Sequence, residues 1–170
     1  MSTISTVDDP ANDVGLQTDI AIGIEGLPVI SYGEFTGASL KVAHCANASC
    51  VGAVTIIVVD GPPRMVGLES SIAIGSDGLP VISHLDSTAF GLLVSHCANI
   101  ACSGAATSTT VEDTANNEGR YTAIAIGADG RPVISYRDDT ARSLKVAKCA
   151  NAACTGTATI TTVDLSRIHI

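Results

Sequence analysis

The sequence predicts an all-β chain made of three copies of one four-stranded unit. A box of twelve residues occurs three times at a spacing of 52 residues, without insertion or deletion. The box reads IAIGIEGLPVIS at 20–31, IAIGSDGLPVIS at 72–83 and IAIGADGRPVIS at 124–135. Runs rich in Val, Ile and Thr surround each box, whereas no segment keeps a helical period over two turns.

Each box predicts a β-hairpin. An acidic residue followed by glycine separates two apolar runs, and glycine accepts the positive φ that tight hairpin turns require. Pro28, Pro80 and Pro132 begin the second run, where a missing backbone N–H costs the sheet least.

Four strands are expected in each repeat. In the first repeat they lie at about 19–23, 28–32, 39–45 and 53–59, and their counterparts follow one and two periods later. Residues 1–170 therefore form a single repeat domain. Its repeats lie at approximately 9–60, 61–112 and 113–164.

Both ends of the chain depart from the three repeats. Residues 3–8 (TISTVD) match 159–164 (TITTVD), so the chain opens with an extra strand of the last type in a repeat. Residues 166–170 match no repeat and form a non-repeat tail.

A repeat of about 50 residues with four strands is typical of a β-propeller blade. Propellers close with about four to eight blades, so three blades leave two open apolar flanks. We expect a homodimer of three plus three blades that closes a six-bladed ring, with a strand exchanged between the two copies. The alternative fold is a monomeric β-trefoil, which also has three four-stranded repeats.

One known family has similar repeats. Each box is followed by Tyr32, His84 or Tyr136 and then by an acid two residues later. This pattern resembles a bacterial β-propeller-like tandem-repeat family with the unit AIGxDGLPVISYxD…LKVAHCxNxxC…TITTVD. The resemblance covers residues 3–164 and implies the fold. It implies no single activity, because propellers include binding modules, hydrolases and scaffolds.

The charge of the chain excludes some partners. The formal charge is −8, and no Lys/Arg cluster is present, which argues against binding to nucleic acid or to anionic membranes. No apolar run is long enough to span a bilayer. The start Met1–Ser2–Thr3 lacks the basic and apolar regions of a signal peptide.

The six cysteines form three identical Cys-Ala-Asn-x-x-Cys pairs, which bracket the turn after the third strand of each repeat. The pairs are Cys45/Cys50, Cys97/Cys102 and Cys149/Cys154. Disulfides are expected, with reduced thiols and a metal site as alternatives. A structural zinc site needs four ligands, and one pair supplies two, so neither a metal nor another cofactor is expected. Disulfides would favour an extracytoplasmic or secreted location.

The acids after the second strands are one set of candidate ligand-binding residues. Glu34, Asp86 and Asp138 could serve glycoside hydrolysis, which requires two carboxylates. Catalysis also requires the two acids to differ in environment. Because these acids occupy equivalent positions, we expect a structural role in turns.

Two further sets of equivalent residues follow the repeat. Tyr32, His84 and Tyr136 are expected to pack at strand ends, with an aromatic platform for a ligand near the channel mouth as the alternative. The other set is basic and is expected on a solvated face. It contains His44, His96, Lys148, Lys41 and Lys145.

The repeats favour a non-catalytic binding or scaffold module, with a glycan or another small molecule as candidate ligand. One alternative is a glycosidase-like hydrolase at the channel mouth, which would need one repeat to differ from the others. The other is an inactive fragment of a longer propeller.

Overall fold

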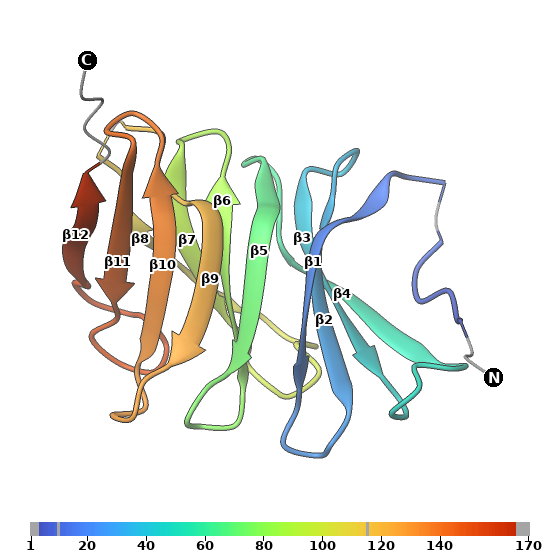
Figure 1. Cartoon of the computed structure of the whole chain (residues 1–170). Helices are drawn as coiled ribbons and strands as arrows, with labels where there is room; N and C mark the ends of the chain where they lie inside the picture. Colours follow the sequence, from blue (N-terminus) through green and yellow to red (C-terminus); the bar gives the residue numbers. More distant parts are fainter. Residues whose placement is uncertain (1–3, 10, 115, 166–170) are drawn as a thin grey trace.

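The computed structural model describes residues 4–9, 11–114 and 116–165, and this part of the chain is all-β, as predicted (Figure 1). Its strands form three antiparallel sheets of four strands, each in sequence order. No helix in the described residues is long and apolar enough to cross a membrane.

Each sheet contains the strands of one repeat. The N-terminal sheet contains β1 (Val14–Ile22), β2 (Pro28–Glu34), β3 (Ser39–Cys45) and β4 (Val54–Asp60). The middle sheet contains β5 (Val66–Ile74), β6 (Pro80–Asp86), β7 (Gly91–His96) and β8 (Thr107–Glu112). The C-terminal sheet contains β9 (Arg120–Ile126), β10 (Pro132–Asp138), β11 (Ser143–Lys148) and β12 (Thr159–Leu165).

The three sheets pack face to face in sequence order. Their first strands lie side by side, β1 against β5 and β5 against β9 (Figure 1). Within the described ranges, the strand pairings join strands of the same sheet. This topology differs from the β-trefoil alternative, in which the repeats share one barrel.

The hairpins form where the boxes predict them. Pro28, Pro80 and Pro132 are the first residues of β2, β6 and β10. The glycine of each turn has positive φ, for example 79° at Gly26. The first strands, however, begin earlier than expected, since β1 starts at Val14 rather than near residue 19. Register shifts interrupt the pairing of β1 with β2 in the first half of β1. The sequence of this half therefore lacks the regular alternation of a strand and predicts a loop.

The extra strand predicted at 3–8 is wrong over the residues that the structure describes. Residues 4–8 have no strand conformation and lie beside the N-terminal sheet. A strand is stable only beside a partner strand, and residues 4–8 pair with no strand of the described chain. Residue 3 and the predicted tail 166–170 lie outside the described residues.

Two hydrophobic clusters fill the spaces between the sheets. Val29, Leu40 and Val42 of the N-terminal sheet pack against Ile72 and Ile82 of the middle sheet. The equivalent cluster joins the middle sheet to the C-terminal sheet. It contains Val81, Leu92, Val94, Ile134, Tyr136 and Ala147 together with Cys149 and Cys154. The core therefore lies between successive sheets, and the middle sheet is covered on both faces.

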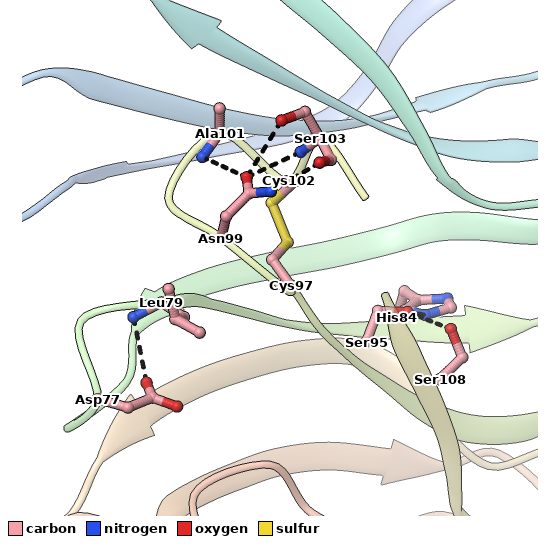
Figure 2. The surroundings of a disulfide bond; sticks show 10 residues. All are labelled: Asp77, Leu79, His84, Ser95, Cys97, Asn99, Ala101, Cys102, Ser103 and Ser108. Atoms are coloured by element: carbon pink, nitrogen blue, oxygen red, sulfur yellow. Dashed lines mark hydrogen bonds between the residues drawn. A yellow bond between two sulfur atoms is a disulfide. The ribbon is translucent and has the colours of Figure 1, made fainter. Parts of the chain in front are cut away.

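The three predicted disulfides are confirmed. Cys45–Cys50, Cys97–Cys102 and Cys149–Cys154 are each bonded, and their Cα atoms lie 4.8–4.9 Å apart. The asparagine of the motif organises the turn: Asn99 Oδ1 accepts the N–H groups of Ala101 and Ser103 at 3.1 and 3.0 Å (Figure 2). Asn47 and Asn151 make the same contacts in the other repeats. The recurring Cys-Ala-Asn-x-x-Cys motif therefore forms a turn that is closed by a disulfide and ordered by its asparagine.

Candidate functional site

Polar side chains form a cluster at one end of each sheet. There the sheet contacts the end of the part of the chain that comes before it: residues 4–8, β4 or β8. Each group combines the acid that ends the preceding segment, a ring on the second strand and a second acid at that strand's end. We call them the N-terminal cluster (Asp8, Tyr32, Glu34 and Lys41), the middle cluster (Asp60, His84 and Asp86) and the C-terminal cluster (Glu112, Tyr136, Asp138 and Lys145).

The N-terminal cluster is organised around the ammonium group of Lys41. The Tyr32 hydroxyl donates to Asp8 Oδ2 at 2.8 Å. Lys41 Nζ lies 3.6 Å from the same Asp8 oxygen and 3.3 Å from Glu34 Oε2. Asn12 Nδ2 donates to Glu34 Oε1 at 2.6 Å, and the Ser39 hydroxyl donates to Oε2 at 2.9 Å. Every polar group of the cluster therefore has a partner within the chain.

Glu118 is a fifth member of the C-terminal cluster, which therefore contains one carboxylate more than the N-terminal cluster. Lys145 Nζ lies 2.9 Å from Glu112 Oε1, 3.1 Å from Asp138 Oδ2 and 3.3 Å from Glu118 Oε1. Tyr136 donates its hydroxyl proton to Glu112 Oε2. Glu118 and Asp138 are buried, so the three carboxylates surround the ammonium group away from solvent.

The middle cluster has a different composition. His84 replaces the tyrosine, and Leu93 occupies the position of the lysine. His84 Nε2 lies 2.9 Å from the Ser95 hydroxyl and 3.9 Å from Asp60 Oδ2 (His84 and Ser95 are labelled in Figure 2). The imidazole is fully buried, and its Nδ1 atom has no hydrogen-bond partner among the described residues.

The surroundings define the protonation states. Burial and the hydrogen bonds to Asp8 and Glu112 raise the pKa values of Tyr32 and Tyr136, so both phenols stay protonated. Burial alone would lower the pKa of Lys145, but its bonds to Glu112 and Asp138 outweigh that effect and raise it.

Two further groups are shifted downwards. The hydrogen bond from Asn12, with those from Ser39 and Lys41, lowers the pKa of Glu34 despite its burial. Burial lowers the pKa of His84 to about 4, so its imidazole is neutral near pH 7. Near pH 7 the rings of Tyr32, His84 and Tyr136 are therefore uncharged and the ammonium group of Lys145 is charged, which suits a structural role for the clusters.

The predicted aromatic set lies inside the structure. Tyr32, His84 and Tyr136 are exposed by 3, 0 and 1% of their surface. His84 and Tyr136 lie between sheets, whereas Tyr32 lies on the outer face of the N-terminal sheet, where its hydroxyl bonds to Asp8. With so little ring surface exposed, the described chain offers no open ring face as a platform.

The predicted acids make local contacts. Asp86 Oδ1 accepts the N–H groups of Thr88 and Ala89 at 2.8 and 3.0 Å, and Asp138 Oδ1 accepts that of Ala141 at 2.7 Å. These are turn contacts of the kind expected for acids at equivalent positions. Glu34 differs because side chains, rather than backbone N–H groups, occupy its carboxylate.

The predicted basic set separates into two groups. His44, His96 and Lys148 pair with acids on the first hairpin of their own sheets, and Lys148 Nζ lies 2.7 Å from Asp129 Oδ2. The prediction of a solvated face is wrong for Lys41 and Lys145. Each side chain is 12% exposed and lies inside a cluster. Among the described residues, no group of three His, Cys, Asp or Glu side chains could hold a metal ion.

Sequence reasoning missed the acids that end the fourth strands. Asp60 and Glu112 lie 52 residues apart, and Asp8 and Asp164 continue the same series, so the repeat carried a signal for them. Glu118 had no such signal, because Val66 and Val14 occupy its equivalent positions.

Each outer sheet has a hollow on the face that points away from the middle sheet. The face of the N-terminal sheet, here called the leading flank, has a hollow of about 500 Å³ whose lining includes Ile20, Ile30 and Tyr32. The face of the C-terminal sheet, here called the trailing flank, has one of about 380 Å³ whose lining includes Ser135 and Leu144.

Comparisons with known proteins show the fold alone. No family model matches the chain, and no curated protein matches its sequence. A protein of unknown function from Dyadobacter fermentans is similar in structure, with a TM-score of 0.65 and 12% identity over 86% of this chain and 41% of that one. A GH43 β-1,3-galactosidase has a TM-score of 0.66 and 12% identity over 96% of this chain and 36% of that one.

A smaller protein is similar over most of its own length. A fucose lectin from Kordia zhangzhouensis, solved with methyl-fucoside, has a TM-score of 0.50 and 6% identity, covering 85% of this chain and 96% of that chain. The chain spans about two-fifths of the length of the first two structures. At these identities the likeness is one of sheet arrangement.

Proposed function

We propose that the chain is a non-catalytic carbohydrate-binding module whose sheets are propeller blades, and that a second copy completes a six-bladed ring. The observation that carries this proposal is that both flanks present residues which are buried at the equivalent interior positions. Leu40 and Leu92 are 0% exposed between sheets, whereas Leu144 on the trailing flank is 44% exposed. Ile72 is 5% exposed, whereas Ile20 on the leading flank is 56% exposed.

The two flanks are complementary in the same way as the interior faces. Ser31 on β2 bonds to Ser70 on β5 at 3.2 Å, and Ser83 on β6 bonds to Thr122 on β9 at 2.9 Å. The next pair in the series is Ser135 with Thr18, and these residues lie on opposite flanks of one chain. A second copy docked head to tail brings them together, and two copies close with two equivalent interfaces.

The backbone also favours this docking. A side chain at Gly67 would meet the Leu40 backbone at 2.6 Å, and one at Gly119 would meet Leu92 at 2.9 Å. The equivalent Gly15 has nothing within 4 Å. In the ring, the backbone of Leu144 of the second copy takes up this space.

Carbohydrate is the ligand class that the comparisons favour. The galactosidase and the fucose lectin are named for sugars, although a shared fold alone does not define a ligand. The disulfides further favour an extracellular location, where glycans are abundant ligands. The carboxylates of the clusters bond within the chain, which favours binding over catalysis.

A glycan array that includes fucosylated and β-1,3-galactosylated glycans tests the ligand class. We expect binding that free sugar competes away, confirmed by calorimetry with several equivalent weak sites per ring. An array without a binder would overturn the carbohydrate assignment.

One observation favours a hydrolase as the second candidate. The C-terminal cluster holds three carboxylates around Lys145, and a GH43 β-1,3-galactosidase shares the fold. Glycoside hydrolysis uses two carboxylates in unlike environments. Release of galactose from a β-1,3-galactoside that is lost in Glu112→Gln and Asp138→Asn would favour this candidate over the binding module.

A further inference from the structure

The N-terminal segment 4–8 contacts the leading flank in the way that a fourth strand contacts the next sheet. Asp8 accepts the hydroxyl proton of Tyr32, just as Glu112 at the end of β8 accepts that of Tyr136. Asp8 also lies near Lys41, as Glu112 lies near Lys145. The Ser5 hydroxyl donates to the carbonyl of Cys50 at 3.3 Å, which ties the segment to the cysteine turn as well.

Residues 4–8 cover the leading flank less completely than β4 and β8 cover the sheets that follow them. Val59 of β4 and Val111 of β8 pack against the interior clusters that contain the cysteine pairs. Val7 is their equivalent, but it borders the hollow of about 500 Å³ on the leading flank. The space that a whole preceding sheet would fill is therefore only partly filled by residues 4–8.

Another segment of the chain has the same sequence features. β12 begins TITTVD, and its Asp164, one residue before the end of the strand, is exposed on the trailing flank. If the trailing flank of a second copy docks on the leading flank, its Asp164 reaches the position that Asp8 holds beside Tyr32. The two acids cannot both occupy that position.

We propose that residues 4–8 are a built-in placeholder for β12 of a second copy, and that ring closure displaces them. This inference rests on the proposed ring. β12 is held to β11 by a ladder that runs from Ser143–Leu165 to Lys148–Thr159. Residues 4–8 form no strand and are held by the contacts of Ser5 and Asp8. Because a ladder of backbone hydrogen bonds costs more to break than a few side-chain contacts, the placeholder leaves and β12 stays in its sheet.

The placeholder weakens self-association, because each new contact to Asp164 replaces one to Asp8. Asp8→Ala should therefore tighten the dimer, by roughly tenfold in dissociation constant for each interface, as expected for one charged hydrogen bond. Asp164→Ala should weaken it by a similar factor. Asp9→Ala is the matched control, since Asp9 is exposed and lies next to Asp8, and it should change nothing.

Sedimentation equilibrium of these variants of the 170-residue chain distinguishes the outcomes. Tightening by Asp8→Ala with weakening by Asp164→Ala supports the placeholder. Weakening by Asp8→Ala with no effect of Asp164→Ala would indicate that residues 4–8 replace β12 in the partner's sheet, and would overturn the proposal. A dimer that neither substitution alters would overturn it while leaving the ring intact. If the wild type and all variants remain monomers, the ring itself is wrong.

Discussion

The interior sheet interfaces and the two flanks of this chain use the same residue positions in opposite environments. Leu92 is buried between the middle and C-terminal sheets, whereas its equivalent Leu144 is exposed. The polar clusters show the same contrast, because the acid beside Tyr136 ends a paired strand, whereas the acid beside Tyr32 belongs to a segment without strand structure. The difference shows that positions buried between successive sheets are exposed on the two outer faces of the chain.

The largest expected effect is a difference in unfolding free energy between substitutions at the buried and the exposed leucine. Leu92→Asp places a charge in the core and should cost more than about 4 kcal/mol of unfolding free energy, enough to prevent folding. Leu144→Asp should change the stability of the monomer by less than about 0.5 kcal/mol, because the side chain faces solvent there. Urea unfolding at low protein concentration measures both. Equal losses would show that the flank is core in the single chain.

The second prediction concerns pH and the buried imidazole. The folded pKa of His84 is about 4, below its ordinary value of 6.5, so the unfolded chain binds the proton first as pH falls. Stability should therefore decrease between pH 6.5 and 4, by a total on the order of 3 kcal/mol. Thermal melts across this range should show a flatter profile for His84→Gln. Identical profiles for the wild type and His84→Gln would refute the assignment.

The third prediction uses the glycines that face a neighbouring sheet. Gly67→Ala combines a positive φ with a backbone clash at 2.6 Å and should cost about 2–3 kcal/mol. Gly15→Ala should cost about 1 kcal/mol, the conformational cost alone, yet it should prevent dimerisation. Gly52→Ala is the control, with positive φ and nothing within 4 Å. A Gly15→Ala variant that dimerises like Gly52→Ala would argue against the head-to-tail interface.

The smallest effect compares two tyrosines. Tyr136→Phe removes a hydrogen bond to the carboxylate of Glu112 on β8 and should cost about 1.5 kcal/mol. Tyr32→Phe should cost less than about 1 kcal/mol, because Asp8 lies on a segment held by few contacts. Denaturant unfolding of the two variants side by side measures the difference, and a larger loss for Tyr32→Phe would contradict it.

Repetition within the chain explains what could be predicted from sequence. The turn glycines, the strand-initiating prolines and the disulfides each occur three times, because each satisfies a local backbone requirement. The start of β1 at Val14 was not predictable, since its irregular pairing removes the two-residue alternation that signals a strand.

The candidate site was predicted less well than the fold. Period-two alternation assigns Lys41 and Lys145 to a face, but it does not reveal what covers that face, which is the segment 4–8 beside Lys41 and the middle sheet beside Lys145. Glu118 breaks the repeat, and so repeat equivalence could not place it in the C-terminal cluster. Residues 4–8 have the sequence of a strand, but conformation depends on a partner strand that sequence alone does not supply.

Molar mass in solution tests the central claim most directly. Light scattering over a concentration series under non-reducing conditions, which preserve the disulfides, should give about 34 kDa for the wild type, twice the chain mass of 17.2 kDa. Leu144→Asp should stay at 17.2 kDa while keeping its fold. A wild-type chain that remains at 17.2 kDa at every concentration would contradict the completion of the ring by a second copy.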